Sequence, residues 1–342
     1  AYRDYVEQFT PEKTAEITGL TPEEICLAAR MVGENLPLAI NPSNASLVHF
    51  KNGMQNHRAV MALSAITGSY DRVGGMIPTY LTYAHSIGGF ETMEPEFSIE
   101  KYPKDGPIPI GCDRFPLWHK VIGEMQACDL PRAILTGKPY PLRALYAHGM
   151  NFRMFPGAAE MEQALKKIEF FVDTDLFLTD SAKYADIVLP ACSSYERGEF
   201  KVFGGGFAQY TSPVIQPLYE SRRDDEIILE LARRLDVEDA LLKSDRDTCI
   251  RHMLRNTPID LDALKQHPEL PQKIAGLHMV GVGQHGFQTP TGKFELDSEI
   301  IRELGAPGLD SLPTYRPSED DADPERYPLI LSTGIRIPGG LH

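Results

Sequence analysis

The chain has no C-x-x-C pair, and its five cysteines stand singly at Cys26, Cys112, Cys128, Cys192 and Cys249. Structural zinc sites and iron–sulfur clusters need cysteines at short, repeated spacings. This stretch of sequence alone therefore offers neither kind of site. We interpret the cysteines as free thiols that behave as small buried apolar residues.

Positive charge is also scarce. Lys and Arg number 34 against 48 Asp and Glu, which gives a net charge of −14. A sequence-independent grip on nucleic acid or anionic lipid depends on surplus positive charge. We therefore expect no nucleic acid partner, and any anionic ligand must be held by a few local groups.

Three further signals are missing from the sequence. No apolar run approaches the roughly 20 residues needed to span a bilayer, so we expect no direct membrane insertion. The N-terminal AYRDYVEQF lacks the basic-then-apolar order of a signal peptide. No G-x-G-x-x-G follows an expected strand, which disfavours an ordinary NAD-dependent dehydrogenase. The compartment stays open between cytoplasm and periplasm.

What is present is an ordinary globular composition. The 342 residues are 42% hydrophobic and 24% charged, enough for two or three domains with substantial cores. The chain begins with Ala1 rather than Met, and it ends in the Gly-rich run PGGLH. We expect it to be a segment of a longer protein.

The first 70 residues carry clear helix signals. Thr10-Pro11 and Thr21-Pro22-Glu23-Glu24 each place a capping hydroxyl before a proline, and the second completes a capping box. Gly19 is a typical helix stop. The pattern next predicts a short buried strand over 37–41 and a helix over 55–67.

Short apolar strands and helices alternate in the middle of the chain. The strands are expected over 144–147, 169–173 and 187–189, and the helices over 158–167, 181–185 and 224–235. This alternation predicts a parallel, Rossmann-like sheet flanked by helices. The stretch 69–142 is rich in Gly, Pro and Tyr with little periodicity, which favours long connections.

The densest chemical signal lies between Leu145 and Gln209. Gly149 and Asn151 follow the first strand, at the edge where open α/β sheets bind ligands. Asp175 follows the second strand, where its carboxylate can accept hydrogen bonds from ribose hydroxyls or from the N–H donors of guanine. Spacing leaves these two ligands open, and it also leaves open an ordinary βα turn at Gly149 and a helix-capping or turn role for Asp175. Arg197 can clamp phosphate and Gly204-Gly205-Gly206 can form a close-approach loop, although a surface loop with a solvated arginine is an equal alternative.

At this point the sequence resembles a known family, the molybdopterin oxidoreductases of the bis-guanine-dinucleotide group. The resemblance rests on D-x-F-x-T from Asp175 to Thr179, ADIVLP at 185–190 and RRDDEIILELARRL at 222–235. It extends to TPEKTAEITGLTPEEICLAARM at 10–31, LVHFKNGMQNHRAVMALSAITGSYDRVGG at 47–75, TPTGKFEL at 289–296 and YPLILSTG at 327–334. Each motif is weak alone, but their common order covers nearly the whole chain.

The resemblance implies a set of cofactor-binding residues. Contacts to the guanosine and pyrophosphate of one pterin guanine dinucleotide are implied for Asn151, Thr174, Asp175, Arg197 and Asp224. Gly149 and Thr179 are implied to shape the pocket, and Asn44, Ser46 and His49 to approach the pterin and metal. His49 is the one candidate for a catalytic role, with packing as its alternative. The chain departs from the family at Glu199, where a glycine is usual, and at 204–206, where polar residues are common.

The resemblance also implies a domain plan. Residues 1–75 would end one nucleotide-binding-like α/β domain, and 76–240 would form a second that binds the pterin guanine dinucleotide. Residues 241–327 would be connecting segments with an acidic linker. Residues 328–342 would start a further β-rich C-terminal domain.

The implied protein is the catalytic subunit of a prokaryotic molybdenum or tungsten oxidoreductase. Its cofactor would be bis-molybdopterin guanine dinucleotide, with a 4Fe-4S cluster and a metal-ligand residue only in a segment upstream of Ala1. It would perform two-electron redox or oxygen-atom transfer on a small substrate, in the manner of thiosulfate or polysulfide reductases. The implied partners are an iron–sulfur electron-transfer subunit and a membrane anchor subunit. The alternative is a non-catalytic scaffold of an electron-transfer complex that kept the fold.

Overall fold

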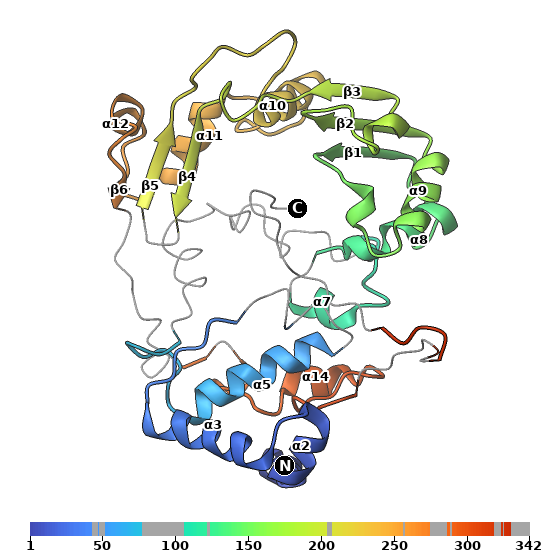
Figure 1. Ribbon diagram of the computed structural model, residues 1–342. Coiled ribbons are helices and arrows are strands. Elements are labelled where there is room, and N and C mark those ends of the chain that lie inside the picture. The colour runs from blue at the N-terminus through green and yellow to red at the C-terminus, as the bar shows by residue number, and fades with distance from the viewer. Residues whose placement is uncertain are drawn as a thin grey trace. The chain divides into compact units, whose positions relative to one another are not determined.

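The chain folds into two compact units, of which Figure 1 shows the elements. In this computed structural model the described residues are 1–42, 47, 52–76, 106–121, 124–203, 207–255, 257–273, 286–287, 289–317, 323 and 325–329. One unit comprises Ala1–Pro78 with Met279–His342, and the other comprises Thr79–His278. Across these described ranges, no helix is long and apolar enough to cross a membrane. The four-part domain plan stays a prediction.

The first unit is helical in its described residues. Its helices are α1 (Tyr2–Val6), α2 (Pro11–Thr18), α3 (Pro22–Glu34), α5 (Gly53–Ile66) and α14 (Glu299–Leu304). The Thr10 hydroxyl accepts a hydrogen bond from the Lys13 N–H at the start of α2, and Gly19 ends that helix with φ of 73°. Thr21 and Glu24 form the predicted capping box of α3. The capping predictions and the helix over 55–67 are confirmed.

The strand predicted over 37–41 is wrong. The Leu38 N–H donates to the Ser69 hydroxyl at 2.8 Å, and the Ile40 N–H to the Met76 sulfur at 3.3 Å. The segment is extended and apolar, but side chains rather than a neighbouring strand satisfy these amides. Among the unit's described residues, β pairing is limited to an isolated bridge between Tyr70 and Met76.

Residues near 310–314 return to pack along α5. The Gln55 amide donates to the Asp310 carbonyl at 2.7 Å, and the Arg58 guanidinium to the Ser311 carbonyl at 2.6 Å. The Asn52 amide donates to the Thr314 carbonyl at 2.9 Å. Segments that are more than 250 residues apart in sequence therefore form one unit.

The second unit contains the predicted parallel sheet. Strands β1 (Ala144–His148), β2 (Phe170–Asp175) and β3 (Ile187–Pro190) pair in parallel in the order β1-β2-β3. The register places His148 beside Thr174 and Asp175 beside Pro190. The α/β fold class, with a parallel sheet flanked by helices, is confirmed. The start of a β-rich C-terminal domain falls almost entirely outside the described residues.

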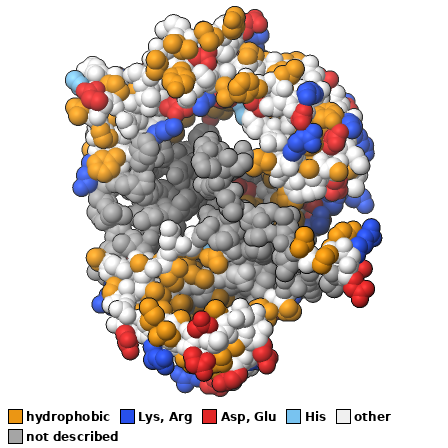
Figure 2. All heavy atoms as spheres, in the orientation of Figure 1, with side chains coloured by type: hydrophobic (Ala, Val, Ile, Leu, Met, Phe, Trp, Pro, Cys, Tyr) orange, Lys and Arg blue, Asp and Glu red, His pale blue; other side chains and the backbone are white. Residues whose placement is uncertain are grey.

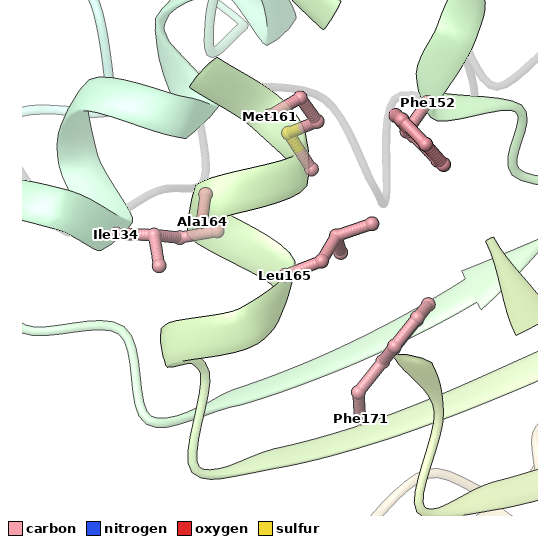
Figure 3. Packing of buried hydrophobic residues seen from close by; sticks show 6 residues of the cluster. All are labelled: Ile134, Phe152, Met161, Ala164, Leu165 and Phe171. Carbon is pink, nitrogen blue, oxygen red and sulfur yellow. The ribbon is translucent and has the colours of Figure 1, made fainter. Parts of the chain in front are cut away.

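A compact core lies beneath this sheet, where α8 (Leu130–Thr136), the 3-10 turn η4 (Phe152–Met154) and α9 (Ala158–Lys167) meet β2. Figure 3 shows the packed side chains of Ile134, Phe152, Met161, Ala164, Leu165 and Phe171, each at most 5% exposed. Large side chains so fully buried contribute roughly 1.5 to 3 kcal/mol each. Helix α8 was missed because 69–142 shows little periodicity overall.

A second, antiparallel sheet follows. It consists of β4 (Glu199–Phe203), β5 (Phe207–Thr211) and the short β6 (Gln272–Lys273). Helices α11 (Arg246–Leu254) and α12 (Leu261–Gln266) pack on it through Ala208, Tyr210, Ile250, Leu254, Leu261 and Leu264. The unit's further described elements include α7 (Pro116–Val121), the 3-10 turns η3 (Ala127–Asp129) and η5 (Ala182–Tyr184), and α10 (Asp224–Arg234). Residues 241–327, which we expected to be connecting segments, thus contain the regular elements α11, α12 and β6.

The acidic surplus is not gathered into one field on the face that Figure 2 shows, where acidic and basic side chains are interspersed. Arg143–Glu169, at 2.8 Å, is one of the chain's exposed ion pairs. Such pairs contribute at most about 1 kcal/mol each. The stronger electrostatic contribution comes from a buried carboxylate at the start of α8.

Asp129 is that carboxylate, and its side chain is fully buried. Arg132 donates to both carboxylate oxygens through Nε, at 3.0 and 2.9 Å, and Arg114 Nη1 donates at 2.6 Å. The hydrogen bonds from Arg132 are the main cause that lowers the pKa of Asp129. The ion pair is therefore present at neutral pH and is lost as pH falls through the lowered pKa.

We expect Asp129→Asn to lower the free energy of unfolding by about 2 to 4 kcal/mol in urea denaturation, because it leaves two arginines without their buried anion. The matched control is Asp113→Asn. Asp113 also pairs with Arg132, at 3.1 Å, but its side chain is 57% exposed. We expect this control to lose at most about 1 kcal/mol. Equal losses in the two variants would contradict the assignment.

Candidate functional site

The candidate site is the carboxyl edge of the parallel sheet. Strands β1, β2 and β3 end at His148, Asp175 and Pro190, and their arrowheads point toward α10 in Figure 1. The Gly149 N–H donates to the Thr174 carbonyl at 2.8 Å, which joins the turns after β1 and β2. Ligands of open α/β sheets bind in the crevice at this edge.

A further backbone segment extends this edge beyond β3. Arg222 forms a parallel bridge with Ala191, in which the Arg222 N–H donates to the Pro190 carbonyl at 3.0 Å. The Cys192 N–H in turn donates to the Arg222 carbonyl at 2.9 Å. Helix α10 begins two residues later, at Asp224. The pairing therefore delivers the acidic first turn of α10 to the ends of the strands.

Five charged or titratable side chains form a continuous chain along this edge, which we call the edge charge chain. His148 Nδ1 lies 3.2 Å from Asp224 Oδ1, and Arg197 Nη1 donates to Asp224 Oδ2 at 2.9 Å. Arg197 Nε donates to Glu199 Oε1 at 2.7 Å, and Lys201 Nζ lies 2.7 Å from Glu199 Oε2. The edge charge chain links side chains from β1, α10, the 191–198 loop and β4.

Glu196 fixes the loop that carries Arg197. Its carboxylate accepts hydrogen bonds from the Ser193 N–H at 2.8 Å, the Leu218 N–H at 2.6 Å and the Ser221 hydroxyl at 2.8 Å. These bonds, the Leu218 amide first, lower the pKa of Glu196 to about 2. The ionised Glu196 thus connects the 191–198 loop to residues 218–221 through hydrogen bonds, and it holds the backbone next to Arg197 in place.

Gly198 sets the distance between this loop and β5. A Cβ atom at this position would lie 2.2 Å from Tyr210 Oη, closer than any side chain tolerates. The backbone after Arg197 can therefore approach β5 only because residue 198 has no side chain.

Asp173 lies just below the edge, in the interior of β2. It is fully buried, and neither carboxylate oxygen forms a hydrogen bond of acceptable geometry with any described residue. Burial raises the pKa of Asp173 to about 6, the charge of Asp175 adds to the shift, and His148 opposes it. Because the folded pKa exceeds the ordinary 3.8, stability falls as pH rises between about 4 and 6. The sheet thus holds an energetically unfavourable buried carboxyl group directly beneath the candidate site.

A cavity of about 390 Å³ opens beside the edge charge chain. His148 and Asp224 line one part of it, and Ile228, Ile250 and Met253 from α10 and α11 line another. Apolar walls with a few convergent polar groups are typical of small-molecule sites. The lining suits a flat heterocycle whose polar edge meets a carboxylate.

The structure brings together five of the residues implied by the resemblance, namely Gly149, Thr174, Asp175, Arg197 and Asp224. Thr174 is 1% exposed and its hydroxyl lies 3.3 Å from the Tyr146 hydroxyl, so it supports the edge from below. Asp175 accepts the Leu176 N–H at 2.6 Å through Oδ1. Its role toward a ligand stays a prediction.

Asn151 and Thr179 both have local partners. The Asn151 side chain accepts the Arg153 N–H at 3.2 Å, and Thr179 Oγ1 accepts the Ala182 N–H at 3.2 Å. In each residue the side-chain oxygen therefore accepts a hydrogen bond from a backbone N–H of its own turn. Ligand contacts from these two residues stay predictions. Asn44, Ser46 and His49 lie outside the described residues, so their predicted approach to a cofactor also stays untested.

Sequence reasoning missed His148, Glu196 and Asp173 as members of the site. His148 is the last residue of β1 and directly precedes Gly149, so its position at the carboxyl edge could have been inferred from the strand boundary. The roles of Glu196 and Asp173 depend on burial and on distant partners, for which the sequence gives no signal.

Comparisons with known proteins agree with this architecture. A family model described as molybdopterin oxidoreductase matches residues 42–234, and the chain belongs to that family. It is 31% identical to the probable oxidoreductase YoaE of Bacillus subtilis (strain 168), over 99% of this chain and 46% of that protein. It is 26% identical to dimethyl sulfoxide reductase DmsA of Escherichia coli (strain K12), over 97% of this chain and 44% of that protein.

A solved structure supports the fold assignment. Acetylene hydratase from Pelobacter acetylenicus superposes with a TM-score of 0.80 at 26% identity, covering 98% of this chain and 49% of that chain. The chain spans about half the length of these three relatives. Family membership implies a molybdopterin cofactor with molybdenum or tungsten.

We expect Asp173→Asn to flatten the pH dependence of stability, because an amide at this position cannot ionise. Relative to the unchanged protein, the variant should gain about 1 to 3 kcal/mol as pH rises from 4 to 7, measured by urea unfolding at four pH values. Asp4→Asn serves as the control, since the Asp4 side chain is 81% exposed. A gain of the same size in the control would remove Asp173 as the cause.

Proposed function

We propose that the carboxyl edge of β1, β2 and β3 binds the guanine dinucleotide part of a bis-molybdopterin guanine dinucleotide cofactor. The observation that carries the proposal is the joining of His148, Asp224 and Arg197 at this edge, at 3.2 and 2.9 Å. A guanidinium, a carboxylate and an adjacent apolar cavity are there held together by four separate segments of backbone.

The residues present fit such a group. Apart from its two chain neighbours, no described residue places an atom within 4 Å of a Cβ built on Gly149, whose φ is +57°, so the described surroundings leave room for a phosphate close to this backbone. The Arg197 guanidinium matches the geometry of phosphate oxygens. The carboxylates of Asp224 and Asp175 can accept the N1–H and N2–H donors of guanine or the hydroxyls of ribose.

The bound cofactor would supply the metal centre at which two-electron redox or oxygen-atom transfer occurs. The chain's own residues would bind and orient the organic tail, and the apolar side chains of α10 and α11 would pack against the base. No group of three or more His, Cys, Asp or Glu in the described part of the chain could hold a metal ion. In this proposal the 4Fe-4S cluster and the protein ligand of the metal belong to an upstream segment.

We infer that the whole protein is the catalytic subunit of an oxidoreductase acting on a small substrate. Its relatives include a dopamine dehydroxylase from Eggerthella lenta and an acetylene hydratase from Syntrophotalea acetylenica. This range does not favour thiosulfate or polysulfide over other substrates, so the proposal leaves the substrate open. One relative, from Methanococcus maripaludis, is the alpha subunit of a formate dehydrogenase, which supports the proposal that this protein also works with partner subunits. We propose that these partners are an iron–sulfur protein and a membrane anchor.

Guanine specificity can be tested with mononucleotides. We expect GDP to raise the melting temperature of the full chain more than ADP at equal concentration, because a carboxylate pairs with the N1–H and N2–H donors that adenine lacks. Differential scanning fluorimetry measures the shift. Equal shifts would argue against recognition of guanine.

Cofactor content provides a second test in the whole protein. We expect Asp224→Asn to reduce bound molybdenum or tungsten, and guanine nucleotide released by acid, by about tenfold or more, since a charge-assisted hydrogen bond contributes roughly 1.5 to 3 kcal/mol. The metal is measured by mass spectrometry and the nucleotide by chromatography.

The control for that test is Asp262→Asn on α12. Asp262 pairs with Arg251 at 2.6 Å and lies outside the edge charge chain. Full cofactor content in the Asp224 variant would refute the assignment of that residue. A whole protein that contains neither metal nor guanine nucleotide would favour the scaffold alternative.

A further inference from the structure

We propose that Glu199 is a built-in competitor for the phosphate-binding fork of Arg197, so that this site selects its ligand by the nucleoside more than by the phosphates. The inference rests on the proposed function, because it concerns the same site.

The geometry of Arg197 shows that its fork is already occupied. Nε and Nη2 both lie 2.7 Å from Glu199 Oε1, and Nη1 lies 2.9 Å from Asp224 Oδ2. All the guanidinium nitrogens therefore face carboxylates. A phosphate that binds Arg197 in the bidentate mode through Nε and Nη2 must displace the Glu199 carboxylate.

Glu199 is the carboxylate that can be exchanged. Its second oxygen lies 2.7 Å from Lys201 Nζ, two residues along the same strand, so Glu199 keeps a cationic partner after it releases Arg197. Asp224 by contrast is also engaged by His148 at 3.2 Å. The hydrogen bond from Lys201, together with Arg197, lowers the pKa of Glu199, so the competitor is ionised at neutral pH.

The charges around Arg197 balance. Arg197 and Lys201 contribute two positive charges, and Glu199 and Asp224 contribute two negative charges, while His148 is the remaining titratable neighbour in the edge charge chain. A diphosphate therefore meets an edge with little net attraction. The uncharged nucleoside is unaffected by this balance, so its hydrogen bonds and base packing dominate selection.

The test measures binding of guanosine, GDP and inorganic pyrophosphate to the full chain by isothermal titration calorimetry. We expect Glu199→Gln to tighten binding of GDP and of pyrophosphate about tenfold, because Arg197 loses its charged competitor while Gln keeps the size of the side chain. The affinity for guanosine should stay within about twofold. Raising the salt concentration should shrink the gain.

Two controls define the effect. Glu199→Asp keeps the charge and should stay close to the unchanged protein. Glu169→Gln removes a glutamate that pairs with Arg143 at 2.8 Å just before β1 and β2, at the opposite edge of the same sheet, and should change no affinity. If Glu199→Gln fails to fold, as judged by circular dichroism, Glu199→Ala takes its place.

The outcomes separate the inference from the proposed function. Unchanged or weaker binding of both GDP and pyrophosphate by the Glu199 variants overturns the inference, and so does the absence of any binding of these two anions. Guanosine binding in that case still supports the proposed guanine site. Tighter pyrophosphate binding without any guanosine binding supports the competitor role of Glu199, but it overturns selection by the nucleoside and counts against guanine recognition.

Discussion

The site depends on the parallel pairing that continues past β3 to Arg222. Without the two hydrogen bonds that Arg222 makes with the backbone of Pro190 and Cys192, α10 would not begin at the carboxyl edge. Asp224 would then lie away from His148 and Arg197, and the edge charge chain would be broken. A short stretch of backbone pairing thus decides where the acidic first turn of a helix meets a basic loop.

Two buried carboxyl groups of the second unit, Asp129 and Asp173, have opposite environments. Asp129 is fully buried and satisfied by two arginines, so its charge stabilises the fold. Asp173 is equally buried but lacks a hydrogen-bond partner among the described residues, and its pKa rises to about 6. Structural carboxylates are paired in this way, whereas costly unpaired groups concentrate at functional sites. The position of Asp173 directly beneath the ligand edge is consistent with that tendency.

Positive and negative side chains balance one another within the edge charge chain. In the proposed function a diphosphate needs local cations, and Arg197 and Lys201 are the cations of the edge charge chain. Glu199 and Asp224 balance that charge, so in our proposal recognition depends on shape and hydrogen bonding. Such a site would hold a large organic cofactor by its nucleoside while avoiding indiscriminate binding of small anions.

The sequence by itself determined local features, such as the Thr21–Glu24 capping box, the strands of the parallel sheet and the family motifs around Asp175. These depend on neighbouring residues or on periodicity, which a sequence displays directly. Tertiary structure alone decided that 37–41 would bond to side chains rather than to a strand. It also decided that His148 would meet Asp224 across 76 residues. Both outcomes depend on which distant segment comes close, and that is fixed only when the whole unit packs.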